Sequence, residues 1–126
     1  MTQEEKQLLL KDLCARLPYG VIVSYQVGKN APVNRVLTGK ALDELVSGSY
    51  VDEWLKCSFK PYLRPMESMT EEEEIYYNTI YTTLKFYEKE DWLNAHHFDY
   101  RIVPSTGKTM IESNLAIEAP EGMYEI

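Results

Sequence analysis

Hydrophobic positions near the start of the chain follow the spacing of an amphipathic helix. Apolar side chains recur three and four residues apart at Leu9, Leu10, Leu13, Cys14 and Leu17. Thr2 and Glu5 have the spacing of a capping box, and Pro18 cannot continue a helix. The pattern therefore predicts a helix over residues 2–17, and its single apolar stripe favours a core face over a partner groove.

After this helix the pattern becomes typical of short β-strands. Two runs rich in β-branched residues, 21–27 and 33–38, are separated by Gly28 and Pro32. Each run predicts a strand, since β-branched and aromatic side chains fit a pleated surface and glycine and proline mark turns. The two strands are expected to begin a small antiparallel sheet.

The next part of the chain is less regular. Residues 41–46 fit a helical turn as well as a strand, and these alternatives stay open. Residues 47–49 predict a turn, and residues 50–55 predict a third strand with 57–59 as its continuation. Short strands joined by tight turns favour a curved, barrel-like sheet, which needs a helix across its apolar face.

The pattern changes from β-like to helical around two prolines, Pro61 and Pro65. Each lacks a backbone donor and disfavours helix in the residue before it, so an extended, stiff connector is expected here. Thr70 then has the position of a helix N-cap, and Glu73 completes a capping box. The four glutamates at 71–74 suit the positive end of the helix dipole.

The last part of the chain is expected to be mainly helical. Apolar and aromatic spacing predicts a long helix over residues 71–88, followed by a charged break at 88–91. Asp91 is placed to cap a further short helix, and residues 109–113 predict one more helical segment. Asn114 is expected in the left-handed conformation that ends it, with an extended tail beyond.

These elements predict one α+β domain over residues 1–126. Residues 1–66 are expected to hold the N-terminal helix and a small antiparallel, barrel-like sheet. Residues 67–126 are expected to form a helical, acidic C-terminal half. A chain of 126 residues is long enough to build one hydrophobic core.

Composition favours an ordinary globular protein with a cytoplasmic location. Hydrophobic residues make up 44% and charged residues 26% of the chain, and no apolar run approaches the ~20 residues of a membrane span. The acidic N-terminus argues against a signal peptide. Cys14 and Cys57 are too few for a disulfide framework and are expected to be buried, reduced thiols. No membrane partner is expected.

The net charge of −7 is divided unevenly. Residues 1–66 carry nine Lys or Arg and seven Asp or Glu, which gives +2. Residues 67–126 carry four and thirteen, which gives −9. A solvated acidic helix explains this division without any function, whereas the alternative is that the two halves face different partners.

No residues at recognisable spacing supply a nucleophile with a base, so the chain is not expected to be an enzyme. Neither a cofactor nor a metal is expected. The most suggestive group is His96, His97 and Asp99, which a metalloenzyme or hydrolase would use. Adjacent histidines on a helix point about 100° apart, so one buried and one exposed histidine is the simpler expectation. Whether the three meet a cysteine in the fold stays open.

Four stretches resemble a family of uncharacterised bacterial proteins. They are residues 8–20, 60–66 (KPYLRPM), 91–101 (DWLNAHHFDYR) and 115–124 (LAIEAPEGMY). The resemblance implies a bacterial, cytoplasmic protein of unknown activity. It supplies no functional residues to carry over.

The functional hypothesis is a small protein-interaction module with a basic protein partner. Ten tyrosines against three phenylalanines suggest many rings at the boundary between core and water, where the hydroxyl stays solvated. Aromatic rings beside an acidic helix suit a basic partner. The candidate binding residues are Tyr62, Arg64, Trp92, His96, His97 and Arg101. The oligomeric state stays open.

The alternative hypothesis is nucleic-acid binding by the sheet. Its basic residues are Arg16, Lys29, Arg35, Lys40, Lys56, Lys60 and Arg64. Its stacking residues are Tyr19, Tyr25, Tyr50 and Tyr62. The overall acidity of the chain counts against this alternative, because affinity for nucleic acid comes mainly from neutralising phosphates.

Overall fold

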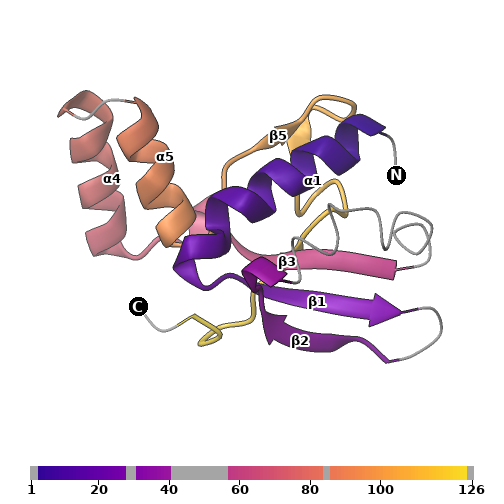
Figure 1. Ribbon diagram of the computed structural model, residues 1–126. Helices are drawn as coiled ribbons and strands as arrows, with labels where there is room; N and C mark the ends of the chain where they lie inside the picture. Colours follow the sequence, from indigo (N-terminus) through magenta and orange to yellow (C-terminus); the bar gives the residue numbers. More distant parts are fainter. Residues whose placement is uncertain (1–2, 28–30, 41–56, 84–85, 125–126) are drawn as a thin grey trace.

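The structure, a computed structural model, combines an open sheet, a helix along one face of it and a pair of helices at one end (Figure 1). Helices and strands are mixed, so the predicted α+β class is confirmed. The residues that the structure describes are 3–27, 31–40, 57–83 and 86–124.

Several predictions lie outside the described residues. They concern the cap at Thr2, the helix or strand at 41–46, the turn at 47–49 and the strand at 50–55. Lys29, Tyr50 and Lys56 of the nucleic-acid hypothesis lie there too, as does the side chain of Cys57.

The predicted N-terminal helix is confirmed as α1, Gln3–Arg16. Leu9 and Leu13 are fully buried, one turn apart on the side that faces the sheet. Cys14 is exposed, so the prediction of a buried thiol is wrong for this residue. The reason is geometric: one step beyond Leu13 turns the side chain about 100° away from the buried side.

The first two predicted strands are confirmed as β1, Ile22–Val27, and β2, Val33–Val36. β1 lies between β2 and β3, Cys57–Pro65, and pairs antiparallel with both. The expected continuation at 57–59 is therefore the beginning of a longer strand.

The expected stiff connector is instead part of this strand, because β3 runs through both prolines. Pairing with β1 ends at Pro61, opposite Val23, and pairing on a second ladder begins only at Tyr62, opposite Ile117. Pro61 thus lies where one ladder gives way to the next, and Pro65 is the last strand residue. At these positions a proline interrupts the pairing least.

Two helices, α4 and α5, follow β3. α4 covers Glu71–Thr83 and α5 covers Phe86–Ala95, so the predicted charged break at 88–91 is wrong. Glu and Lys are good helix formers, and Leu93 is buried, so the helix continues through the charged residues. Asp91 lies inside α5 and does not cap it.

Between Ala95 and Tyr124, where the described part of the chain ends, the structure contains no further helix, which corrects the prediction of a helical C-terminal half. The four strands of this part are β4, Phe98–Asp99; β5, Ile102–Val103; β6, Lys108–Thr109; and β7, Ile117–Glu118. β5 and β6 pair antiparallel, whereas β4 and β7 each pair parallel with β3. Strands of two residues are too short to show a periodic pattern, so their positions follow from the strands with which they pair.

The main sheet has the order β2-β1-β3-β4, with β7 also on β3. It is not closed, so the barrel-like prediction is wrong. The sheet stays open because β2 and β4, the strands at the two ends of this order, do not pair with each other. Its parallel pairs were not expected either. Between β3 and β4, the helices α4 and α5 provide the crossover that a parallel connection needs.

The helical segment predicted at 109–113 is a series of turns after β6. The buried carboxylate of Asp99 accepts hydrogen bonds from the backbone N–H groups of Met110 (3.2 Å) and Ile111 (3.0 Å). These bonds hold the turn in a form that local sequence does not specify. Asn114 has a φ of 63°, so its predicted left-handed conformation is confirmed.

The core lies between α1 and the sheet and extends to the C-terminal strands. Its buried residues are Leu9, Leu13, Val21, Val23, Leu37, Leu63, Val103, Met110, Leu115 and Ala116. Within the described ranges, no helix combines the length and the apolar character needed to cross a membrane.

Candidate functional site

A buried ion pair attaches α4 to the end of β3. Arg64 donates through Nη1 to Oε2 of Glu73 (2.9 Å) and through Nη2 to Oε1 (2.7 Å). A further bond from Nη2 reaches the Ser68 carbonyl (3.3 Å), and the guanidinium lies 4.3 Å from the centre of the Phe98 ring. The hydrogen bonds from Arg64 lower the pKa of Glu73 to about 2, against the opposing effect of burial.

The predicted capping box is confirmed at the start of α4. The Thr70 N–H donates to Oε1 of Glu73 (2.9 Å), and the Glu73 N–H donates to Oγ1 of Thr70 (3.2 Å). Glu73 is therefore buried and paired, whereas Glu71, Glu72 and Glu74 are exposed. The four consecutive glutamates have two different roles.

An aromatic cluster around Trp92 joins α4 to α5. The Trp92 ring centre lies 5.4 Å from that of Tyr76, 6.0 Å from Tyr77, 4.5 Å from His96 and 5.7 Å from Phe98. His96 also places Nδ1 3.4 Å from Oε2 of Glu73, so the cluster continues into the ion pair. The inward side of α4 is thus held by both charged and aromatic contacts.

Three of the six candidate binding residues, Arg64, Trp92 and His96, are brought together in this way. The other three lie elsewhere. The Tyr62 hydroxyl donates to Oδ1 of Asn34 (2.9 Å) on the sheet. His97 and Arg101 belong to separate clusters.

Arg101 belongs to a buried network that ties α1 to the C-terminal part of the chain. Nε of Arg16 lies 2.9 Å from both carboxylate oxygens of Asp12, and Nε of Arg101 donates to Oδ1 of Asp12 (2.9 Å). Arg16 also donates through Nη2 to the Phe98 carbonyl. The Asp12–Arg16 pair was not predicted from the sequence, although its spacing of four residues on a helix is typical of an ion pair.

This burial bears on the nucleic-acid hypothesis. Arg16 and Arg64 are buried in ion pairs, so neither is available to contact phosphates. Arg35 and Lys40 are exposed, and Lys60 donates to Oδ1 of Asn114 (3.0 Å). The described part of the sheet therefore carries fewer free cations than the sequence suggested.

His97 is buried, as expected for one histidine of the pair, and His96 is half-buried. The backbone of His97 has a φ of 62°, and its ring stacks on Tyr124 with ring centres 3.8 Å apart. Burial, with nearby Arg16, lowers the pKa of His97 to about 4. Burial also raises the pKa of Asp99, whose carboxylate is occupied by backbone N–H groups.

Among the described residues, no group of three or more His, Cys, Asp or Glu side chains is arranged to hold a metal ion. His96 faces Glu73, whereas His97 faces Tyr124.

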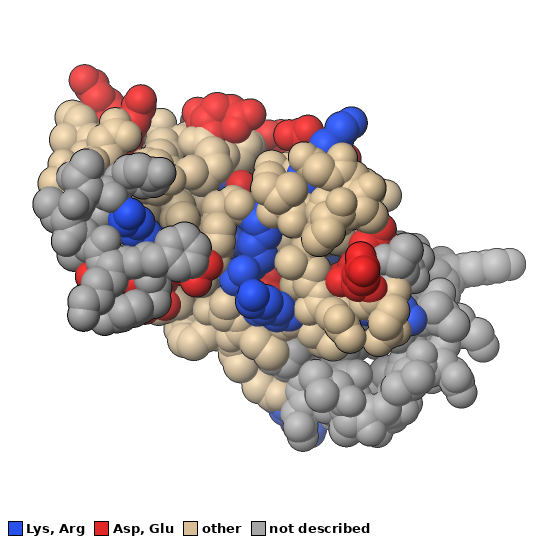
Figure 2. Space-filling model, turned by 90° about the horizontal axis from the view of Figure 1, so that it is seen from above, with Lys and Arg blue, Asp and Glu red and all other residues tan. Residues whose placement is uncertain are grey.

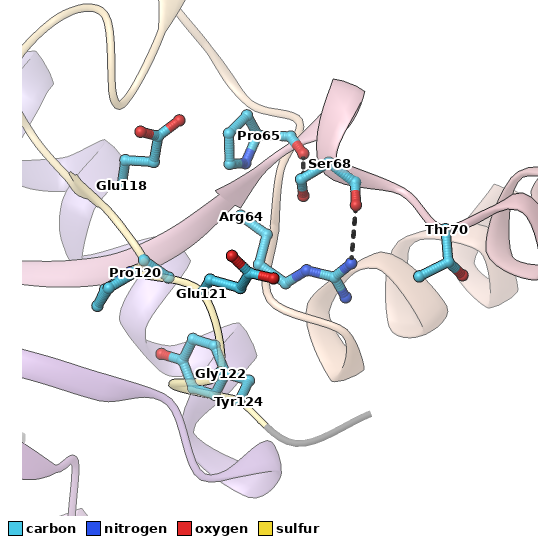
Figure 3. Close-up of a pocket in the computed structure, with 10 residues that line it drawn as sticks. Arg64, Pro65, Ser68, Thr70, Glu118, Pro120, Glu121, Gly122 and Tyr124 are labelled. Atoms are coloured by element: carbon cyan, nitrogen blue, oxygen red, sulfur yellow. Dashed lines mark hydrogen bonds between the residues drawn. The ribbon is translucent and has the colours of Figure 1, made fainter.

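Two hollows flank the short 3₁₀ turn η2, Met66–Ser68. The first, the tail pocket, has a volume of about 410 Å³ and includes Arg64, Ser68, Thr70, Glu118, Glu121 and Tyr124 in its lining. Figure 3 shows Arg64 reaching from β3 towards Ser68, with the C-terminal tail on its other side. The Tyr124 hydroxyl holds this tail by donating to the Tyr62 carbonyl (2.8 Å) and accepting from the Ile22 N–H (2.8 Å).

The second hollow, the methionine groove, lies between η2 and α4. Its volume is about 580 Å³, and its lining residues are Met66, Glu67, Met69, Glu74, Tyr77 and Asn78. Apolar and acidic side chains therefore share one concave surface, and none of its described lining residues is basic.

The outward side of α4, with Tyr76 at its border with the aromatic cluster, combines charge with exposed apolar surface. Glu71 and Glu72 are exposed, and one turn further along the helix Ile75 is 62% and Tyr76 49% exposed. We call these four residues the α4 ridge. On the face seen in Figure 2, basic side chains form a short central band with acidic side chains around it. Opposite charges are thus interspersed on this face.

No known protein family, curated protein or solved structure matches this chain. The resemblance to uncharacterised bacterial proteins stays a prediction.

Proposed function

We propose that this protein is an interaction module that binds a basic partner protein through the α4 ridge. The observation that carries the proposal is the exposure of Ile75 and Tyr76 directly beside Glu71 and Glu72. Large apolar side chains supply affinity when a partner removes them from water, and the glutamates favour encounter with a positively charged surface.

The attachment of α4 supports this proposal. Glu73 on the inward side is paired with Arg64, and Trp92 packs against the same helix. A helix that is already fixed loses little conformational freedom when a partner binds its outer side. The ridge is therefore presented in a preorganised form.

A nucleic-acid partner has less support. The two exposed glutamates of the ridge, Glu71 and Glu72, would repel a polyanion. Two of the cations that the alternative hypothesis requires, Arg16 and Arg64, are buried.

The experiment compares capture of partners by three forms of the tagged full-length chain. These are the wild type, a ridge variant (Glu71→Gln, Glu72→Gln, Ile75→Ser) and a control variant (Glu4→Gln, Glu112→Gln, Ile102→Ser). The control removes two exposed glutamates and an exposed isoleucine elsewhere, since Ile102 is 55% exposed. Glu73 is retained in all three forms, because its loss would disturb the attachment of α4. Captured proteins are quantified by mass spectrometry, with and without nuclease treatment of the lysate.

We expect the ridge variant to lose a protein that the wild type and the control both retain. Nuclease should not change this result. Nuclease-sensitive capture that is equal in the ridge variant and the wild type would contradict the proposal and favour nucleic-acid binding.

A further inference from the structure

The methionine groove lies beside the α4 ridge and has a chemistry of its own. We propose that it receives a lysine or arginine side chain from the basic partner, an inference that rests on the proposed function. Three observations support it: the apolar lining, the two carboxylates without an ion pair, and the lack of a basic side chain among the described lining residues.

The apolar part of the groove fits the stem of a long cationic side chain. Met66 begins η2, Met69 directly follows its last residue, and Tyr77 comes from the second turn of α4. All three are half-buried, so each offers a side chain that is held in place yet still accessible. Thioether groups are flexible and polarisable and adapt to the methylene groups of lysine or arginine.

The acidic part of the groove fits the charged end. Glu67 on η2 and Glu74 on α4 are both exposed, and in the described part of the chain neither carboxylate is engaged in an ion pair. Asn78 adds an amide that can accept a further hydrogen bond. An anionic side chain would be repelled by two carboxylates, and an apolar one would leave them without a partner.

The tail pocket on the other side of η2 is less suitable for a cation. Its lining also contains two exposed glutamates, Glu118 and Glu121, but Arg64 contributes a guanidinium to it. Among the described residues that line the methionine groove, none is basic. We therefore place the cationic side chain of the partner in the methionine groove rather than in the tail pocket.

The test is an NMR titration of the full chain labelled with ¹³C at the methionine methyl groups. The probe is a short peptide of alternating arginine and alanine, and its matched control has citrulline in place of arginine. Citrulline keeps the shape of arginine and removes its charge. We expect the methyl signals of Met66 and Met69 to shift with the arginine peptide and not with the citrulline peptide. The signal of Met110, which is buried in the core, should stay unchanged.

Two variants complete the experiment. Glu67→Gln with Glu74→Gln should weaken the binding of the arginine peptide roughly fivefold, whereas Glu4→Gln with Glu112→Gln should change it by less than about twofold. Equal weakening in the two variants, or an absence of methyl shifts at Met66 and Met69, would overturn the inference. Since the ridge variant changes none of the groove residues, loss of partner capture in that variant supports the proposed function even when the groove inference fails.

Discussion

Replacing Glu73 with glutamine tests how α4 is attached to the sheet. Glutamine keeps the shape of glutamate and still suits the capping box with Thr70, so the substitution mainly removes the charge that faces Arg64. The pKa of Glu73 is lowered from 4.5 to about 2, and at about 1.4 kcal/mol per pKa unit this corresponds to about 3 kcal/mol of stability at neutral pH. A similar loss is expected when one partner of a buried ion pair is removed.

The lowered pKa of Glu73 also predicts how the free energy of unfolding depends on pH. Because the pKa of Glu73 is lower in the folded than in the unfolded chain, the folded chain takes up this proton less readily. The stabilisation is complete above about pH 5 and is lost as the pH falls from 4.5 towards 2. We expect wild type and Glu73→Gln to differ by about 3 kcal/mol at pH 7 and by less than about 0.5 kcal/mol at pH 2.

Urea unfolding followed by circular dichroism at a series of pH values measures both effects. Glu72→Gln is the matched control, since it removes an exposed charge from the same turn and should cost less than about 0.5 kcal/mol. Equal stabilities of Glu72→Gln and Glu73→Gln at pH 7 would refute the reasoning, because the two glutamates would then be equivalent.

Three further predictions concern the core, a turn and a buried histidine. Leu13→Ala should cost about 2–5 kcal/mol in urea unfolding, whereas Cys14→Ala should cost less than about 0.5 kcal/mol; a small loss for Leu13 would contradict its burial. Asn114→Ala should be about 1 kcal/mol less stable than Asn114→Gly, because only glycine adopts a φ near 63° without strain; equal stability would be inconsistent with that conformation. Since burial lowers the pKa of His97 to about 4, the wild type should lose stability as the pH falls from 6.5 towards 4, and His97→Gln should not; an equal loss in both would argue against a buried neutral imidazole.

The features that could be predicted from the sequence are those that local pattern determines. The leucine spacing of α1 and the β-branched runs of β1 and β2 each repeat with the period of their own element. The capping box at Thr70 and the left-handed Asn114 depend on the chemistry of one or two residues. In each case the information lies within a few positions of the feature itself.

The features that were predicted wrongly depend on contacts between distant segments. β3 passes through Pro61 because its pairing changes from β1 to β7 at that point, and only the fold supplies these partners. The charged residues at 88–91 belong to α5, because the burial of Leu93 stabilises the helix beyond them. The turn after β6 is held by Asp99 from another strand.

The candidate site could be predicted only in part, because it too depends on contacts between distant segments. Arg64, Trp92 and His96 were selected by residue type, and the structure brings them together. The special role of Glu73 was hidden among four identical residues, although its capping position was a signal. A glutamate at that position turns back towards the N-cap, and so towards the end of β3, while its neighbours point outward.

Phe98 connects the two buried arginines of this fold. Its carbonyl accepts a hydrogen bond from Arg16, and its ring lies under the guanidinium of Arg64 and beside Trp92. One arginine secures α1 through Asp12, and the other secures α4 through Glu73. The two helices are therefore positioned against the same buried residue of β4, although they are far apart in the sequence. The orientation in which α4 presents its outer side thus depends on packing between distant segments, and the partner that we propose would recognise the folded chain rather than an isolated acidic helix.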